Sequence, residues 1–332
     1  MTEAVLETVP DALSAHELSV GYDTRQGRLQ ALRDVSLDVR AGEIVGVVGE
    51  SGCGKSTLIS TLMRLLPENA HVADGCVELD GEDILTASPR RLRAMRGREM
   101  SVVFQDPMTS LNPVLTIGRQ MRDIQYREGI SKAEKDRRAA HMLGRVGLPD
   151  PEAKLRTYPH ELSGGMRQRV AIAMATLMHP KLLIADEPTT ALDATLEVQI
   201  IALLQEIQAE IGCAILFISH HLGVIAELCD RVVVMYAGET VEEGPVADIF
   251  EHPAHPYTAK LIECDPGRLK QRAETLPSIP GSLPDLTDPP PGCIFRDRCD
   301  LATDLCARQR PSRRAVTPGR WSACHHAEKV SP

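Results

Sequence analysis

The segment GESGCGKST at residues 49–57 carries the clearest structural information in the chain. It has the spacing G-x-x-x-x-G-K-[ST], follows an apolar run at residues 43–48 and precedes an apolar segment at residues 58–66. A buried strand, a glycine-rich loop and a helix in this order form a phosphate-binding loop, because backbone N–H groups and the positive end of the helix both face an anion. The sequence therefore predicts a nucleoside triphosphate site.

Composition excludes several classes of protein. The chain has 332 residues and a net charge of −9, and only 3% of its residues are aromatic. Nucleic-acid binding needs clustered Lys and Arg or stacking aromatic platforms, so we expect no nucleic-acid partner. The length favours two domains.

Membrane and secretion signals are also lacking. The apolar run at residues 170–178 is about half as long as a bilayer span requires. The first twelve residues are acidic and do not resemble a signal peptide. We therefore expect a cytoplasmic location with reduced thiols.

The pattern of apolar segments predicts an α/β fold. Residues 16–20 and 31–39 have the features of antiparallel strands, and apolar strands that alternate with helices follow from residue 43 onward. This alternation predicts a parallel sheet covered on both faces. A charged helical stretch at about residues 106–165 interrupts it as an inserted subdomain, and six prolines between Pro277 and Pro291 predict an extended connection.

Two further segments carry chemistry. Asp186 and Glu187 follow an apolar strand, where an aspartate can hold Mg²⁺ and the next carboxylate can polarise an attacking water. Lys55 can reach the β- and γ-phosphates, and Ser56, assisted by Thr57, offers a hydroxyl to Mg²⁺.

A second anion-binding surface is expected at Ser163-Gly-Gly, which precedes a helix. The paired glycines are explained better by one half of a site that two subunits share than by a plain helix cap.

Taken together, these segments resemble the nucleotide-binding subunit of ATP-binding cassette (ABC) transporters. The phosphate loop, Gln105, LSGGM at residues 162–166, LLIADE at residues 182–187, ALD at residues 191–193 and His220 occur in the family's order. The resemblance covers about residues 14–250. It is strongest to the peptide-importer ATPases, through FQDPMTSLNP at residues 104–113, YPHELSGGM at residues 158–166, HPYT at residues 255–258 and the four-cysteine tail.

The resemblance implies a P-loop NTPase (RecA-like) ABC domain at residues 14–254 and a peptide-importer extension at residues 255–332. The domain would have an antiparallel β subdomain and a helical insert. ATP and Mg²⁺ are the implied cofactors.

The resemblance also implies roles for single residues. Gln105 is similar to the lid glutamine that contacts Mg²⁺, and His220 is similar to the switch histidine at the γ-phosphate. Asp193 is similar to an aspartate that crosses to the opposing subunit. Tyr22 stands where the family has an adenine-stacking aromatic, although it can equally be a core tyrosine. The implied ATP contacts also include Gly49, Ser51, Gly52, Cys53, Gly54, Lys55, Ser56, Thr57, Ser163, Gly164, Gly165 and Asp186.

One position departs from the family pattern. The family has an acid directly after the switch histidine, and this chain has His221. Because Glu187 is intact, we expect ATP hydrolysis, with Glu187, His220, Gln105 and Lys55 as the catalytic residues.

Four cysteines crowd the tail: Cys293, Cys299, Cys306 and Cys324. Four thiolates can hold zinc or an iron–sulfur cluster, and the absence of a closely spaced cysteine pair favours iron–sulfur. The subfamily resemblance likewise implies a [4Fe–4S] cluster; zinc and free thiols remain alternatives. The tail has eight Lys or Arg and four Asp or Glu from Cys293 onward, and a solvated face is the simplest interpretation of that charge.

The implied function is ATP hydrolysis that drives di- or oligopeptide uptake at the cytoplasmic face of the membrane. The implied partners are a paralogous ATPase subunit, two permease subunits and an extracytoplasmic binding protein. An ATPase of the same subfamily for nickel, opines or glycosides is the alternative. A soluble ABC-type regulator is remote, because such proteins usually carry two cassettes or long coiled coils.

Overall fold

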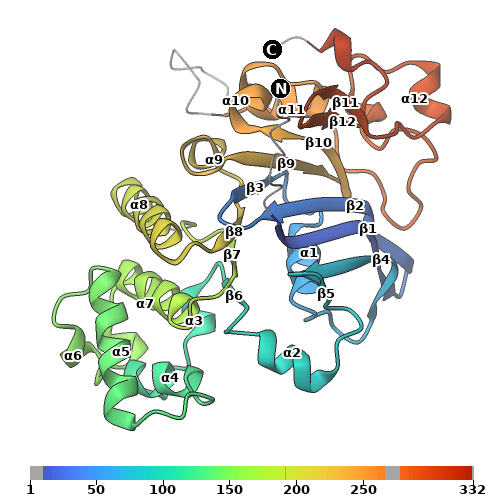
Figure 1. Ribbon diagram of the computed structural model, residues 1–332. Helices are drawn as coiled ribbons and strands as arrows, with labels where there is room; N and C mark the ends of the chain where they lie inside the picture. The colour runs from blue at the N-terminus through green and yellow to red at the C-terminus, as the bar shows by residue number, and fades with distance from the viewer. Residues whose placement is uncertain (1–9, 191, 266–276, 331–332) are drawn as a thin grey trace, which may run out of the picture. The chain divides into compact units, whose positions relative to one another are not determined.

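The computed structural model describes residues 10–190, 192–265 and 277–330. These residues form two compact units, one from the described residues of Met1–Ala87 and Phe217–Pro332 and the other from Ser88–Leu216 (Figure 1). Strand β8 (Ala214–Ile218) carries the chain from the second unit back to the first.

A four-stranded antiparallel sheet opens the first unit. A long hairpin of β1 (Asp11–Thr24) and β2 (Gly27–Arg40) is extended by β4 (Ala70–Leu79) and β5 (Glu82–Asp83), in the order β2-β1-β4-β5. Alternate residues of β2 from Val35 to Val39 are buried, which confirms the predicted half-buried antiparallel strand.

The second sheet of this unit contains the strand that leads into the phosphate loop. Its strands lie in the order β11 (Arg314–Thr317), β12 (Arg320–Ser322), β10 (Glu239–Pro245), β9 (Arg231–Tyr236) and β3 (Ile44–Val48). β3 and β9 are parallel and the other neighbours are antiparallel. Segments from the end of the chain therefore continue the sheet that positions the phosphate loop.

The helices of this unit are short. They are α1 (Lys55–Leu62), α9 (Leu222–Leu228), α10 (Val246–Glu251), α11 (Pro256–Glu263) and α12 (Asp304–Arg308). Residues 277–292 contain no helix or strand, as their prolines predict.

The second unit is mainly helical. Its strands β6 (Met100–Val103) and β7 (Leu182–Asp186) are parallel neighbours. Its helices are α2 (Pro89–Met95), α3 (Pro107–Ser110), α4 (Ile117–Ile124), α5 (Lys132–Arg145), α6 (Pro151–Lys154), α7 (Gly164–Thr176) and α8 (Ala194–Ile211). The Ser88 and Ser131 hydroxyls cap α2 and α5, because they accept hydrogen bonds from backbone N–H groups in the first turns of these helices.

Strand β10 could not be predicted from its composition, ETVEEGP. Its residues Glu239, Glu242 and Glu243 are at most 5% exposed. Glutamates are rarely buried without partners, so this composition does not indicate a buried strand. Burial raises the pKa of Glu242, as expected for a desolvated carboxylate.

Arginines from the end of the chain explain why these carboxylates can be buried. Arg310 Nε lies 3.1 Å from Glu239, Arg320 Nη2 lies 3.0 Å from Glu242, and Arg313 Nη2 lies 3.3 Å from Glu243. Trp321 also donates its indole N–H to Glu243 at 2.8 Å, and the Arg313 guanidinium stacks 3.9 Å above the Trp321 ring. The expectation that the basic tail is only a solvated face is therefore wrong for these arginines.

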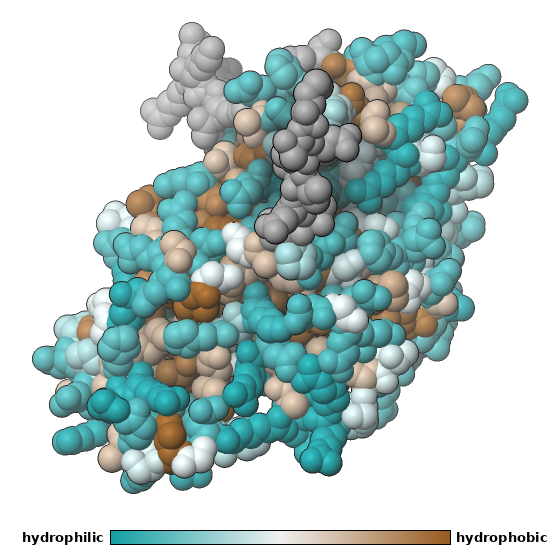
Figure 2. Space-filling view, viewed as in Figure 1, coloured by the Kyte–Doolittle hydropathy of each residue, from teal (hydrophilic) through white to brown (hydrophobic). Residues whose placement is uncertain are grey.

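None of the helices in the described part of the chain combines the length and apolar composition that a membrane span needs. On the face seen in Figure 2, hydrophilic residues predominate and hydrophobic residues occur in small separate groups.

The buried pairing on β10 leads to a stability prediction. Replacement of Arg320 by alanine leaves the fully buried Glu242 without its arginine, so we expect a loss of about 3–5 kcal/mol in the free energy of unfolding. The control is Arg308→Ala, which removes an exposed pair with Asp304. Urea unfolding measures both, and equal stability of the two variants would contradict the inferred role of Arg320.

Candidate functional site

The phosphate loop of the first unit has a backbone that requires glycine. Gly54 has φ of 106°, and a Cβ atom there would lie 2.9 Å from the Ala31 carbonyl oxygen. A Cβ atom on Gly49 would lie 2.2 Å from the Met235 carbonyl oxygen. Only residues without a side chain fit these positions, so the loop adopts the close turn that an anion site needs.

Lys55 begins helix α1 and is held by the loop itself. Its Nζ donates to the carbonyl oxygen of Gly49 at 2.6 Å and to that of Glu50 at 3.1 Å, and the residue is 8% exposed. The two carbonyl groups therefore fix the cation within the loop, where its charge can attract a phosphate.

The remaining residues of the loop differ in orientation. Ser51, Gly52 and Ser56 are exposed, whereas Cys53 is fully buried. Burial raises the pKa of the Cys53 thiol, so this side chain is a neutral core group. A contact between Cys53 and a nucleotide would have to come from its backbone.

Tyr22 on β1 lies beside the loop. Its hydroxyl is 3.2 Å from the Thr57 hydroxyl, and its side chain is half-buried. The aromatic ring is therefore close to the end of the phosphate loop. Its stacking on adenine stays a prediction.

In the second unit, Glu187 follows β7 and is constrained at both backbone and side chain. Its φ is 44°, a left-handed conformation that is unfavourable for glutamate. Its Oε2 atom accepts hydrogen bonds from Gln105 Nε2 at 2.8 Å and from Thr190 Oγ1 at 3.0 Å. Gln105 and Glu187 meet because each follows one of the paired parallel strands β6 and β7, next to Asp186 at the end of β7. The sequence pattern gives no role to Thr190, which lies three positions after Glu187 and is recognised only from this hydrogen bond.

Ser163 and Asp193 both cap helices in this unit. The Ser163 hydroxyl accepts from the Met166 N–H at 3.3 Å, and the Asp193 carboxylate accepts from the Leu196 N–H at 2.9 Å. Both side chains are exposed. The two glycines differ, because Gly164 has open space around it whereas a Cβ on Gly165 would lie 3.0 Å from Leu196. Ala191 of the ALD segment lies outside the described residues.

His220 and His221 follow β8 in the first unit and are exposed. Their rings are 4.6 Å apart and meet edge to face at 75°. The backbone N–H of His221 donates to the Ser219 hydroxyl at 3.0 Å, and His221 caps helix α9. The acid that the family has at this position is thus replaced by an imidazole that meets the predicted switch histidine edge to face.

The four cysteines of the tail gather within the first unit. Cys293, Cys306 and Cys324 are buried, and the Cys293 N–H donates to the Cys306 carbonyl at 2.7 Å. Burial raises the pKa of Cys293 to about 12, and the other three thiols add to the rise. This donor set has the chemistry of an iron–sulfur site. The side chains are not arranged to hold a metal ion, however, since the described residues contain no such group of three or more His, Cys, Asp or Glu.

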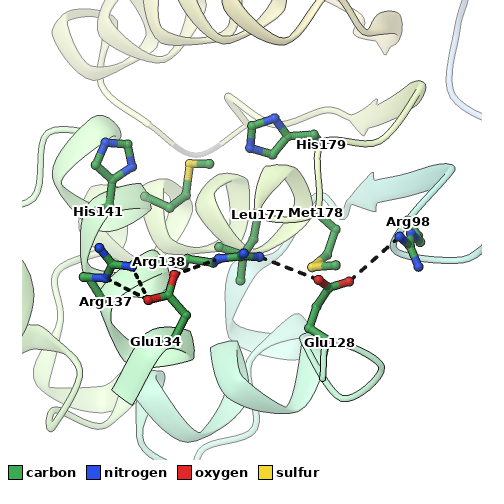
Figure 3. Close-up of a pocket in the computed structure, with 10 residues that line it drawn as sticks. Arg98, Glu128, Glu134, Arg137, Arg138, His141, Leu177, Met178 and His179 are labelled. Carbon is green, nitrogen blue, oxygen red and sulfur yellow. Dashed lines mark hydrogen bonds and ion pairs between the residues drawn. The ribbon is translucent and has the colours of Figure 1, made fainter. Parts of the chain in front are cut away.

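A separate cavity of about 610 Å³ lies in the second unit and contains none of the predicted site residues (Figure 3). Arg138 crosses it, with Nη1 3.7 Å from Glu128 and Nε 3.3 Å from Glu134. Arg98 also pairs with Glu128, at 4.0 Å. Because each of these charges lies next to an opposite one, we interpret the cavity as part of an ion-pair network within the helical unit.

Comparison with known proteins identifies the family. Models of the ABC transporter family and of the oligopeptide/dipeptide transporter C-terminal region match residues 32–190 and 241–306. The chain is 45% identical to a probable peptide ABC transporter ATP-binding protein of Sinorhizobium fredii over 96% of both chains. It is also 45% identical to the oligopeptide transport ATP-binding protein OppD of Salmonella typhimurium, over 94% of this chain and 92% of OppD.

A solved structure supports the same assignment. A dimeric ATP-binding cassette in a post-hydrolysis state with ADP and Pi matches with a TM-score of 0.63 and 28% identity, over 70% of this chain and 98% of that one. This likeness confirms the predicted α/β P-loop NTPase fold. The chain belongs to the ATP-binding proteins of ABC transporters, and it carries the C-terminal region of the oligopeptide and dipeptide transporters.

Proposed function

We propose that the chain hydrolyses ATP to drive the uptake of di- or oligopeptides through partner permeases. One observation carries this proposal: the chain matches peptide-transport ATPases over almost its whole length, C-terminal region included, and keeps Glu187 hydrogen bonded to Gln105. Nickel, opine or glycoside uptake is the alternative, because selectivity lies in the binding protein and the permeases.

The residue roles follow the chemistry of phosphoryl transfer. Lys55 binds the β- and γ-phosphates, and Ser56, Gln105 and Asp186 bind Mg²⁺. Glu187 polarises the attacking water as a general base. The backbone of residues 49–54 surrounds the phosphates, Tyr22 stacks on adenine and His220 contacts the γ-phosphate.

The remaining residues act across a dimer of ATPase subunits. Ser163, Gly164 and Gly165 of one subunit contact the ATP of the other, and Asp193 reaches the opposing subunit. The dimeric state of the solved cassette supports this arrangement, and we propose a paralogous ATPase as the second subunit.

The permeases are expected to contact the segment around Gln105. Phe104, Met108 and Val114 are 40%, 50% and 75% exposed, which is unusual for hydrophobic residues so close together in sequence. We propose that this segment faces two permease subunits and that the chain lies peripherally on the cytoplasmic face of the membrane. An extracytoplasmic binding protein supplies the substrate.

The ATPase domain is assigned to residues 14–254, with a helical subdomain at about residues 106–165, and the extension to residues 255–332. We also propose that Cys293, Cys299, Cys306 and Cys324 hold a [4Fe–4S] cluster. The support is the donor set of four thiols, and burial raises the pKa of Cys293, Cys299 and Cys324, which disfavours their thiolates unless a cation compensates the charge. Such a cluster would act as a structural link within the extension.

Lys55→Ala tests the nucleotide site and the cargo together. Loss of a charge-assisted contact to the phosphates should weaken ATP binding about a hundredfold, measured by titration calorimetry on the full chain. Cells with only this variant should lose uptake of a labelled oligopeptide. Unchanged peptide uptake together with lost nickel, opine or glycoside uptake would overturn the peptide assignment.

Glu187→Gln tests the general base. We expect turnover to fall by about 10²- to 10⁴-fold while ATP binding persists, so that ATP is retained in a closed dimer. Phosphate release and size-exclusion chromatography with ATP measure the two effects. Glu210→Gln, which changes an exposed carboxylate of α8, is the matched control. Normal turnover in Glu187→Gln would remove Glu187 from this role.

Protein purified without oxygen tests the cluster. We expect a brown preparation with iron and sulfide, and lower iron content in Cys324→Ser than in Cys76→Ser, which removes a thiol outside the tail. A colourless protein with stoichiometric zinc would contradict the cluster assignment.

A further inference from the structure

Glu50, the second residue of the phosphate loop, is held by the C-terminal part of the chain. Its carboxylate forms a two-pronged ion pair with Arg298, with Nη1 to Oε2 at 2.6 Å and Nη2 to Oε1 at 2.9 Å. Its backbone N–H donates to the Tyr257 hydroxyl at 2.9 Å. Residues that are distant in sequence therefore bind both the side chain and the backbone of Glu50.

Arg298 is itself firmly placed. Its side chain is 5% exposed, and it donates to the carbonyl oxygens of Pro280 at 2.9 Å and Ile279 at 3.0 Å. It also donates to the Tyr236 hydroxyl at 3.3 Å. A planar guanidinium with this many fixed acceptors holds a carboxylate in one orientation.

Tyr257, which accepts the backbone N–H of Glu50, is also held in place by its neighbours. Tyr257 is fully buried, and its ring packs 4.7 Å from Tyr236 and 5.4 Å from Phe295. Phe295 stands between Cys293 and Arg298 in the sequence, so one aromatic cluster joins α11 to the cysteine segment. The phosphate loop is therefore hydrogen bonded to a well-packed aromatic cluster.

We propose that Arg298 is a positioning residue for ATP binding, which fixes Glu50 and neutralises its charge. This inference rests on the proposed role of the phosphate loop. A carboxylate two residues before Gly52 would repel a triphosphate unless a cation compensated it, and a loop that is already ordered loses less conformational entropy when ATP binds. Arg298 thus acts on the loop in two ways: it fixes the orientation of Glu50, and it neutralises the charge of Glu50.

The position of Arg298 gives the extension a part in the reaction. Arg298 directly precedes Cys299, and its carbonyl oxygen accepts a hydrogen bond from Lys260 Nζ at 3.0 Å. The conformation of the cysteine segment therefore determines where the guanidinium lies relative to Glu50. An ATPase domain with an altered extension should bind ATP less well, although every residue of its phosphate loop is present.

The test is a set of full-length variants titrated with ATP. Arg298→Ala should raise the Kd for ATP about tenfold, a coupling typical of interacting buried groups, and Arg298→Lys should raise it less. The matched control is Arg308→Ala, which breaks another tail ion pair, the exposed one with Asp304, that does not involve the loop. Its Kd should equal that of the wild type. Lys55→Ala, for which a loss of about a hundredfold is expected, shows separately whether the loop is the ATP site.

The charge argument makes a sharper prediction. Adding Glu50→Gln to Arg298→Ala removes the uncompensated carboxylate, so the double variant should bind ATP more tightly than Arg298→Ala alone. In steady-state assays of the assembled ATPase, KM should rise with Kd in Arg298→Ala while kcat stays within about twofold of the wild type. If Arg298→Ala does not fold, Arg298→Gln, which also removes the charge but keeps a hydrogen-bonding side chain, gives the same comparison with and without Glu50→Gln. An unchanged Kd in Arg298→Ala, or no recovery in the double variant, would overturn the proposal.

Discussion

Charge pairing between strand β10 and the end of the chain is the interaction on which the first unit depends. Three glutamates of β10 are buried. Arginines from the last part of the sequence pair with each of them, and Arg33 and Arg231 pair with Glu239 and Glu243 as well. Buried carboxylates without such partners would destabilise the sheet strongly. The same sheet contains β3 and β9, and β3 leads directly into the phosphate loop. The order of the nucleotide site is therefore linked to residues that carry none of the nucleotide-binding motifs.

A continuous path of contacts connects these features. Arg320 pairs with Glu242, whose carboxylate also accepts the N–H of His255 at 3.0 Å. His255 begins the HPYT segment, in which Tyr257 accepts the N–H of Glu50. The HPYT segment, which resembles the peptide importers, thus has a structural role, because its hydrogen bonds connect strand β10 to the phosphate loop.

The sequence predicts this molecule well where the determining contacts are local. Strand β3, the glycine loop, helix α1 and the caps at Ser88 and Ser131 follow from neighbouring residues. The Glu187–Gln105 contact could be anticipated only through the family resemblance, since 82 positions separate the two residues. Strand β10 and the Glu50–Arg298 pair could not be predicted, because their partners lie far along the chain and no periodicity links them. The arrangement of the tail thiols could not be predicted for a different reason: the spacing of cysteines constrains which residues can be ligands but not their final geometry.

The dependence of β10 on Arg320 has a consequence for how the protein is made. Ribosomes release the chain from its N-terminus, so the phosphate loop and β10 emerge before Arg320 exists to neutralise Glu242. The nascent first unit therefore stays incompletely packed until synthesis of the chain is almost finished. Translation pauses or premature stop codons in the last few dozen codons should expose the whole nucleotide-binding unit to proteases, and not only the tail that they interrupt.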